Sequence, residues 1–131
     1  MPASSVLSLE DGAVVKAGLT GNAGSLSISG RLETNGLTSS GVIFTSTSAE
    51  GAKGAWNGIT MNSGSSSHLA GLTINGAKTG IKYTNSKISL DNVLFSNNTT
   101  AVQVVGNSTV ETALNVTFTN NTTNTNPSGL W

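Results

Sequence analysis

The sequence repeats itself with a period of about 22 residues, within the range of known solenoid repeats, and this limits the folds that the chain can adopt. The phrase Phe-Ser/Thr-Asn-Asn-Thr-Thr begins at Phe95 and again at Phe118. A second pattern, Gly or Ala followed by apolar-x-apolar, begins at Gly58, Gly80 and Ala101, and these starts are almost equally spaced. Two patterns from different parts of the unit therefore give nearly the same period, which indicates a solenoid built from stacked repeats.

Each unit contains short segments in which apolar residues occupy every second position, as in Leu72-x-Ile74, Ile81-x-Tyr83 and Val93-x-Phe95. A period of two is the signal of a strand with one buried face. A unit of this length with three such strands suits one rung of a parallel β-helix, in which rungs pair at about 4.8 Å. No rung can bury its apolar face alone, so several must stack. We predict one all-β domain over residues 1–131, a right-handed parallel β-helix of about five rungs.

An antiparallel meander is the alternative architecture. The dipeptides Asn35-Gly36, Asn57-Gly58 and Asn75-Gly76 all suit the tight turns of β-hairpins. A meander would not require equal spacing in two registers, so the repeat favours the β-helix. The stretch from Thr47 to Lys53 is polar and interrupts the pattern, and we expect it to be an enlarged turn.

Four segments carry a resemblance to a known superfamily: residues 9–18 (LEDGAVVKAG), 27–36 (SISGRLETNG), 42–48 (VIFTSTS) and 54–61 (GAWNGITM). They resemble the pectate-lyase-like right-handed β-helix superfamily, and in particular the rungs of bacterial cell-surface and secreted β-helix proteins. The resemblance covers most of the chain. It implies an extracellular or cell-surface location, and either a structural or adhesive role or the cleavage of acidic polysaccharides.

The composition excludes several classes of partner. The formal net charge is zero and only 9% of residues are charged, against roughly 25% in an average domain. The six basic residues are spread along the chain, so no cluster suits nucleic acid. There is no cysteine, hence no disulfide and no thiolate metal site. No apolar run is long enough to insert into a membrane.

Catalysis by a β-helix enzyme would need carboxylates that converge. Glycoside hydrolysis uses a pair about 5–9.5 Å apart, and a calcium-dependent lyase needs a carboxylate cluster with a basic residue. The six carboxylates do not form such a pair in the expected rungs, and His68 has no acid in its own stretch. We therefore predict no catalytic residue, no metal and no cofactor. A groove that gathers Asp91, Glu111 and either Lys87 or Lys82 would instead favour an enzyme.

The candidate binding residues lie on two outward stripes and beside the enlarged turn: Thr60, Lys82, Gln103, Thr73, Thr117 and Trp56. Hydroxyl and amide groups on such stripes can contact an extended glycan, and a tryptophan beside a loop can stack on a sugar. The alternatives are ordinary solvated faces and a tryptophan that fixes the loop to the rod. Ice binding would need regular threonine ranks, which Leu94, Lys82 and Gln103 interrupt.

We predict a non-catalytic structural or adhesive segment of a bacterial surface or secreted protein, with glycans as candidate ligands. The alternatives are a fragment of a polysaccharide lyase or glycoside hydrolase and an ice-binding solenoid. The segment KGAW before Trp56 resembles PSGLW at Trp131, so we expect the chain to be a piece of a longer solenoid. Open rungs leave unpaired strand edges, which predicts pairing with another protein chain.

The two Phe-Ser/Thr-Asn-Asn phrases should occupy the same corner on successive rungs. Asparagine tolerates left-handed backbone conformations, and stacked amides can form ladders along a solenoid. We therefore expect Asn97 to lie over Asn120, and Asn98 over Asn121, one rung apart.

Overall fold

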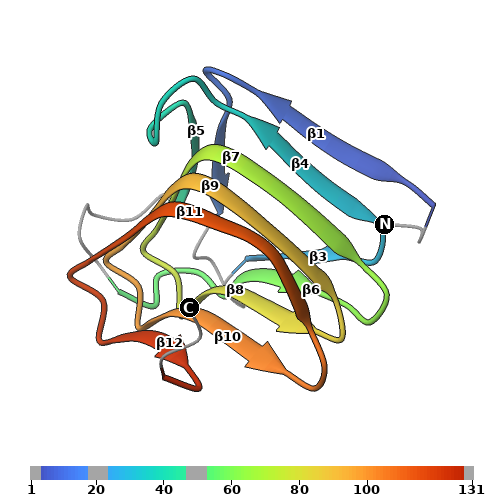
Figure 1. The fold of residues 1–131 in the computed structure, drawn as a ribbon. Helices are drawn as coiled ribbons and strands as arrows, with labels where there is room; N and C mark the ends of the chain where they lie inside the picture. The colour runs from blue at the N-terminus through green and yellow to red at the C-terminus, as the bar shows by residue number, and fades with distance from the viewer. Residues whose placement is uncertain (1–3, 18–23, 47–52, 129–131) are drawn as a thin grey trace.

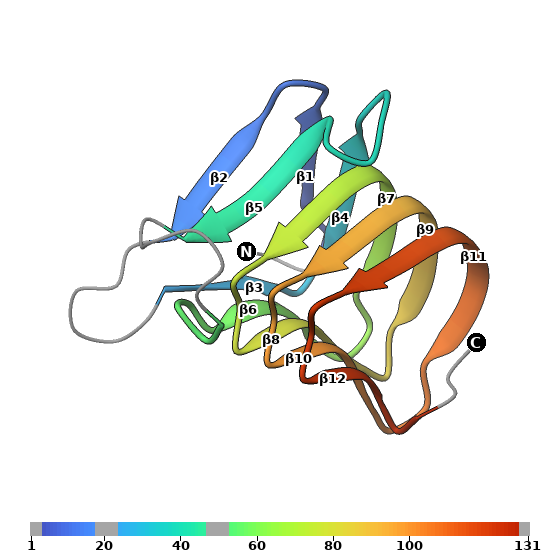
Figure 2. The same cartoon turned by 90° about the vertical axis from the view of Figure 1, so that its left-hand side faces the viewer.

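The structure is a computed structural model that describes residues 4–17, 24–46 and 53–128. In this part of the chain every regular element is a β-strand, and the strands wind around a common axis as a three-sided rod (Figures 1 and 2). The same described residues contain no helix that is long and apolar enough to cross a membrane.

Three columns of strands run along the rod, and all their pairings are parallel. The first column consists of β1 (Val6–Glu10), β4 (Arg31–Asn35) and the first halves of β7 (Ser66–Asn75), β9 (Lys87–Ser96) and β11 (Thr109–Thr119). The second column consists of β2 (Val14–Ala17), β5 (Val42–Ser46) and the second halves of β7, β9 and β11. The third column consists of β3 (Ser25–Ile28), β6 (Gly58–Met61), β8 (Thr79–Thr84), β10 (Thr100–Val105) and β12 (Thr123–Asn126).

Each turn around the axis visits the three columns once, so the described strands form five rungs of a parallel β-helix. This confirms the predicted fold class. The spacing pattern also predicted the correct register, since Ile81 pairs with both Ile59 and Val102, and Val93 pairs with both Leu72 and Val116. The antiparallel alternative is wrong for the described strands, because every pair of them is parallel.

The core is a stack of inward side chains in which each rung covers the next. Phe95 stacks on Phe118 with ring centroids 5.5 Å apart, as expected from the repeated phrase. In the same way Phe44 stacks on Trp56 at 6.4 Å. The fully buried Tyr83 lies on the inward row that also contains Met61, its partner in register.

Residues in left-handed backbone conformations turn the chain at the corners. Between the first and second columns these are Gly71, Asn92 and Asn115, with φ values of 61°, 59° and 52°. Between the second and third columns Asn97 and Asn120 have φ values of 53° and 55°. Glycine and asparagine adopt this conformation at the lowest cost, which explains why they recur at these positions.

The predicted asparagine ladder is present. The Nδ2 atom of Asn120 donates to Oδ1 of Asn97 at 2.7 Å. The Nδ2 atom of Asn98 donates to Oδ1 of Asn121 at 3.1 Å. Most of the enlarged turn predicted at 47–53 and the additional rung predicted at Trp131 lie outside the described residues.

Candidate functional site

The third column carries one of the two predicted stripes. Lys82 pairs in register with both Thr60 and Gln103, and all three side chains are half-buried. They form a row across three rungs, and a role in binding stays a prediction. The row is not a regular threonine array of the kind that an ice-binding surface would require.

The second column carries the other stripe, in which Leu94 pairs with both Thr73 and Thr117. Thr117 is exposed, whereas Thr73 is only 9% exposed. The Thr73 hydroxyl donates to the carbonyl oxygen of Ser39 at 2.6 Å, so the connection between β4 and β5 lies over it. The sequence could not show this cover, because it comes from a turn in the rung below.

A groove on this second column has a volume of about 390 Å³ and is lined in part by Lys16, Thr45, Asn75 and Ser96. Its amide and hydroxyl groups bond to one another. The Nδ2 atom of Asn75 donates to Oγ1 of Thr45, and the Ser96 hydroxyl donates to Oδ1 of Asn75, both at 3.1 Å. These contacts tie neighbouring rungs together and engage both ends of the Asn75 amide.

Trp56 is part of the core and is 2% exposed. Its ring stacks on Phe44, and its Nε1–H donates to the carbonyl oxygen of Asn75 at 2.8 Å. A side chain buried in this way offers no ring face for a sugar. Of the two interpretations of Trp56, the structure favours packing against the rod.

The first column concentrates ionisable side chains to an extent that the sequence did not reveal. It holds seven of the thirteen Lys, Arg, Asp, Glu and His residues of the chain: Glu10, Arg31, Glu33, His68, Lys87, Asp91 and Glu111. None of the seven is buried. They come from segments that are widely scattered along the sequence, so only the register of the rungs brings them to one face.

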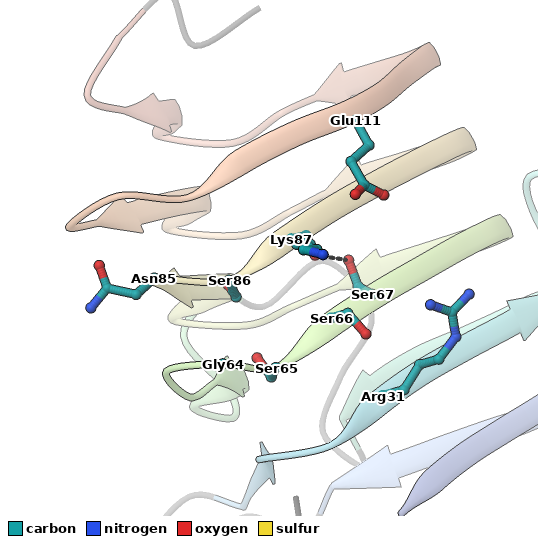
Figure 3. Close-up of a pocket in the computed structure, with 9 residues that line it drawn as sticks. All are labelled: Arg31, Gly64, Ser65, Ser66, Ser67, Asn85, Ser86, Lys87 and Glu111. Atoms are coloured by element: carbon teal, nitrogen blue, oxygen red, sulfur yellow. Dashed lines mark hydrogen bonds between the residues drawn. The ribbon is translucent and has the colours of Figure 1, made fainter. Parts of the chain in front are cut away.

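A groove with a volume of about 350 Å³ crosses this column where its strands begin (Figure 3). Arg31 pairs in register with Ser66, and Ser66 with Lys87, so the two basic residues lie two rungs apart, at about 10 Å. Glu111 lines the same groove from β11. The Nε atom of Arg31 donates to Oε1 of Glu33 at 2.6 Å, a salt bridge that holds the guanidinium on this face.

Serines form the corner side of the groove. Ser65 and Ser86 are 2% and 4% exposed, and neither hydroxyl has a hydrogen-bond partner among the described residues. Ser67, two residues further on, lies 3.1 Å from the hydroxyl of Tyr83. Burial raises the pKa of Tyr83, against a smaller lowering by the Ser67 hydrogen bond, so this phenol stays protonated in the folded protein.

A histidine and a serine meet further along the first column. Nδ1 of His68 lies 3.5 Å from Oγ of Ser89, and Glu33 pairs in register with His68. The acid that was missing from the sequence near His68 thus comes from the rung below. The contact is long for a hydrogen bond, and Glu33 is already engaged by Arg31.

The enzyme-like cluster considered from the sequence is partly assembled. Lys87 and Glu111 line one groove. Asp91 lies four residues beyond Lys87 on β9, about 13 Å along the strand, and Lys82 lies in the third column. The described residues contain no group of three or more His, Asp or Glu side chains that could hold a metal ion.

Comparison with known proteins gives a match at the level of the family. The family model described as "Rhamnogalacturonase A/epimerase, pectate lyase-like" matches residues 15–126, which is most of the chain. No curated protein matches. No solved structure matches either.

Proposed function

Since the chain belongs to the rhamnogalacturonase A/epimerase, pectate lyase-like family, we propose that it is a non-catalytic β-helix segment that holds an acidic glycan on its first column. The family places the chain among carbohydrate-related β-helix proteins. The finer role, holding a glycan without cleaving it, is our inference from the groove described above.

The observation that supports this role is the composition of that groove. Arg31 and Lys87 supply positive charge on two rungs, and Ser66 supplies a hydroxyl between them. Cations and hydroxyl donors suit the carboxylates of acidic sugars. A glycan chain that lies along the rod would meet these groups in succession, because the three residues are aligned along the axis.

The carboxylates favour holding over cleavage. Among the residues that the structure describes, Glu111 is the single carboxylate that lines the groove, and Glu33 is paired with the groove residue Arg31. Hydrolysis by the usual glycosidase route uses two carboxyl groups on opposite sides of the scissile bond. One observation favours the second candidate, a fragment of a lyase or hydrolase: Lys87 and Glu111 line the same groove.

We also propose a location outside the cell, in a secreted or bacterial surface protein, since the glycans that such a groove would bind belong to cell walls and matrices. Another protein chain, or a further rung of a longer solenoid, is the partner that we propose for the edges of the outer strands.

An array of acidic and neutral glycans, combined with a depolymerisation assay on acidic polysaccharides, tests the proposal. We expect binding to acidic glycans without any change in their chain length. Lys87→Gln should weaken binding about tenfold, the loss expected for one charge-assisted contact. Lys82→Gln removes the same charge from the third column and should leave binding unchanged.

Three outcomes would contradict the proposal. Turnover of any polysaccharide would assign the chain to the lyases or hydrolases. A complete lack of binding would remove the glycan role. Weaker binding of the Lys82 variant, with normal binding of the Lys87 variant, would move the site to the stripe of Thr60, Lys82 and Gln103.

A further inference from the structure

We infer that Glu111 is a specificity-determining residue of the groove, and that it restricts the ligand to acidic glycans whose charged sugars are separated by neutral ones. This inference rests on the proposed function and deepens it, because it names the arrangement of charge along the glycan that the groove accepts. It also gives a role to an irregularity in the repeat of the rungs.

The first step of the argument is that Glu111 is an inserted residue. Val110 pairs in register with Ile88. The next pair on the two strands is Thr112 with Ser89, so Glu111 has no partner of its own on β9. Such an insertion is a β-bulge, which is rare between parallel strands. The repeat therefore becomes one residue longer at this point, and Glu111 is the additional residue.

The second step is what the bulge does. Bulges are frequent where a strand pairing ends and next to active sites, where they re-aim a side chain. Here the pairing with β9 resumes at Thr112 and continues to Thr119, so the bulge does not end it. The side chain of Glu111 is exposed, lines the groove and extends from β11 toward the rung of Lys87 (Figure 3). The bulge thus aims a carboxylate into the groove.

The third step is that this carboxylate is available to a ligand. Glu33 is engaged by Arg31, whereas Glu111 forms no salt bridge and no hydrogen bond with another described residue. Lys87 lies one rung below Glu111, and Arg31 lies two rungs below Lys87. The groove is therefore positive along most of its length and negative at the end formed by β11.

The fourth step is the ligand that this order of charges fits. A sugar carboxylate beside Arg31 or Lys87 gains a charge-assisted contact, whereas one beside Glu111 meets a like charge. A hydroxyl of a neutral sugar can instead donate a hydrogen bond to the Glu111 carboxylate. A glycan in which every sugar is charged cannot avoid the repulsion, but a glycan with neutral sugars between the charged ones can. Specific interfaces commonly combine attractive contacts with a repulsive element of this kind.

Calorimetry with two acidic oligosaccharides of equal length, at physiological salt, tests this inference. Every sugar of an oligogalacturonide carries a carboxylate, whereas a hyaluronan oligosaccharide alternates uronic acids with neutral N-acetylated sugars. Glu111→Gln removes the charge and keeps the shape of the side chain. The exchange variant, Glu111→Thr with Thr112→Glu, keeps the net charge and moves the carboxylate to a position that does not line the groove. Asp91→Asn is the matched control, because Asp91 is an exposed carboxylate of the same column outside the groove.

Wild-type protein should bind the hyaluronan oligosaccharide more tightly than the oligogalacturonide. Glu111→Gln should bind the oligogalacturonide about fivefold more tightly than wild type, the gain expected when one like charge at about 4 Å is removed in water. Its affinity for the hyaluronan oligosaccharide should not rise, because a hydrogen bond to the neutral sugar is lost. The exchange variant should behave in the same way. Asp91→Asn should stay within about twofold of wild type, since Asp91 lies about 13 Å from Lys87 along the strand, beyond the screening length of about 8 Å.

The possible results separate this inference from the proposed function. If the wild type binds but Glu111→Gln gains no affinity for the oligogalacturonide, the inference is overturned and the function stands. An equal gain for both ligands, or the same gain in Asp91→Asn, would also overturn it, because the effect would then be one of net charge. Wild-type selectivity in the exchange variant would overturn the role of the bulge, and a wild-type preference for the oligogalacturonide would overturn the proposed ligand. Failure of the wild-type protein to bind either oligosaccharide or any glycan of the array would overturn the proposed function itself.

Discussion

The asparagine corner allows a quantitative test of what holds the rungs together. Asn98 is fully buried where β9 leads into β10. Its Oδ1 accepts the backbone N–H of Ala77 at 2.8 Å, and its Nδ2 donates to the carbonyl oxygen of Ile74 at 3.1 Å. The same Nδ2 also donates to Oδ1 of Asn121 at 3.1 Å. One amide therefore connects its own rung to the rungs on both sides, and Asn98→Ala removes all three contacts at once.

The expected cost follows from the groups that are left behind. In Asn98→Ala the N–H of Ala77 and the carbonyl of Ile74 lose a partner in a buried corner, at about 1–3 kcal/mol each. Asn121 is half-buried on the outermost described rung, so water can replace its lost contact. We expect the free energy of unfolding to fall by about 2–6 kcal/mol, a large part of the roughly 5–15 kcal/mol typical of a domain.

Urea denaturation followed by circular dichroism measures this change. Asn120→Gly is the matched control, since it removes one exposed amide contact of the same ladder and keeps a residue that tolerates the φ of 55°. We expect the control to lose about 1 kcal/mol or less. The reasoning would be refuted if Asn98→Ala cost less than about 1 kcal/mol, or if the exposed control cost as much as the buried variant.

Two further predictions concern the third column. Gly58 has a φ of 95°, and a Cβ atom at this position would overlap the carbonyl of Thr79. Gly58→Ala should therefore prevent these rungs from stacking and give little soluble folded protein. A folded variant that melts at the wild-type temperature would contradict this prediction. Because burial raises the pKa of Tyr83, only the unfolded chain loses its phenolic proton near pH 10. The contribution of Tyr83 to stability should therefore be constant below about pH 10 and fall above it by about 1.4 kcal/mol per pH unit. Tyr83 is the only tyrosine, so tyrosinate absorbance should appear only as the protein unfolds, and titration of the folded protein near pH 10 would disprove the prediction.

The fold was predictable because equivalent positions on adjacent rungs of a solenoid recur in the sequence at the length of one rung. Phe95 and Phe118 occupy the same position on adjacent rungs, so their separation in the sequence is the length of one turn of the rod. The corner asparagines were predictable for the same reason, combined with the tolerance of this residue for left-handed conformations. Where units have nearly equal lengths, a sequence alignment of the repeat is also an alignment in space.

The candidate site was not predictable, because it depends on rungs of unequal length. The chain takes a much longer path from Arg31 to its partner Ser66 than from Ser66 to Lys87, although each pair lies on adjacent rungs. The longer interval contains the connections before β5 and β6, which hide the alignment of Arg31 with Lys87. The stripes chosen from the sequence came from the regular units alone, and the regular units do not include Arg31.

In a β-helix the inward positions build the core, and the outward positions are free to carry functional groups. Inward positions recur at the rung period because each side chain must cover its neighbours, and this restricts them to apolar residues and a few satisfied polar ones. Outward positions carry no such requirement, so charges can gather wherever the register aligns them. In this chain they gather on the first column, on strands that are far apart in the sequence.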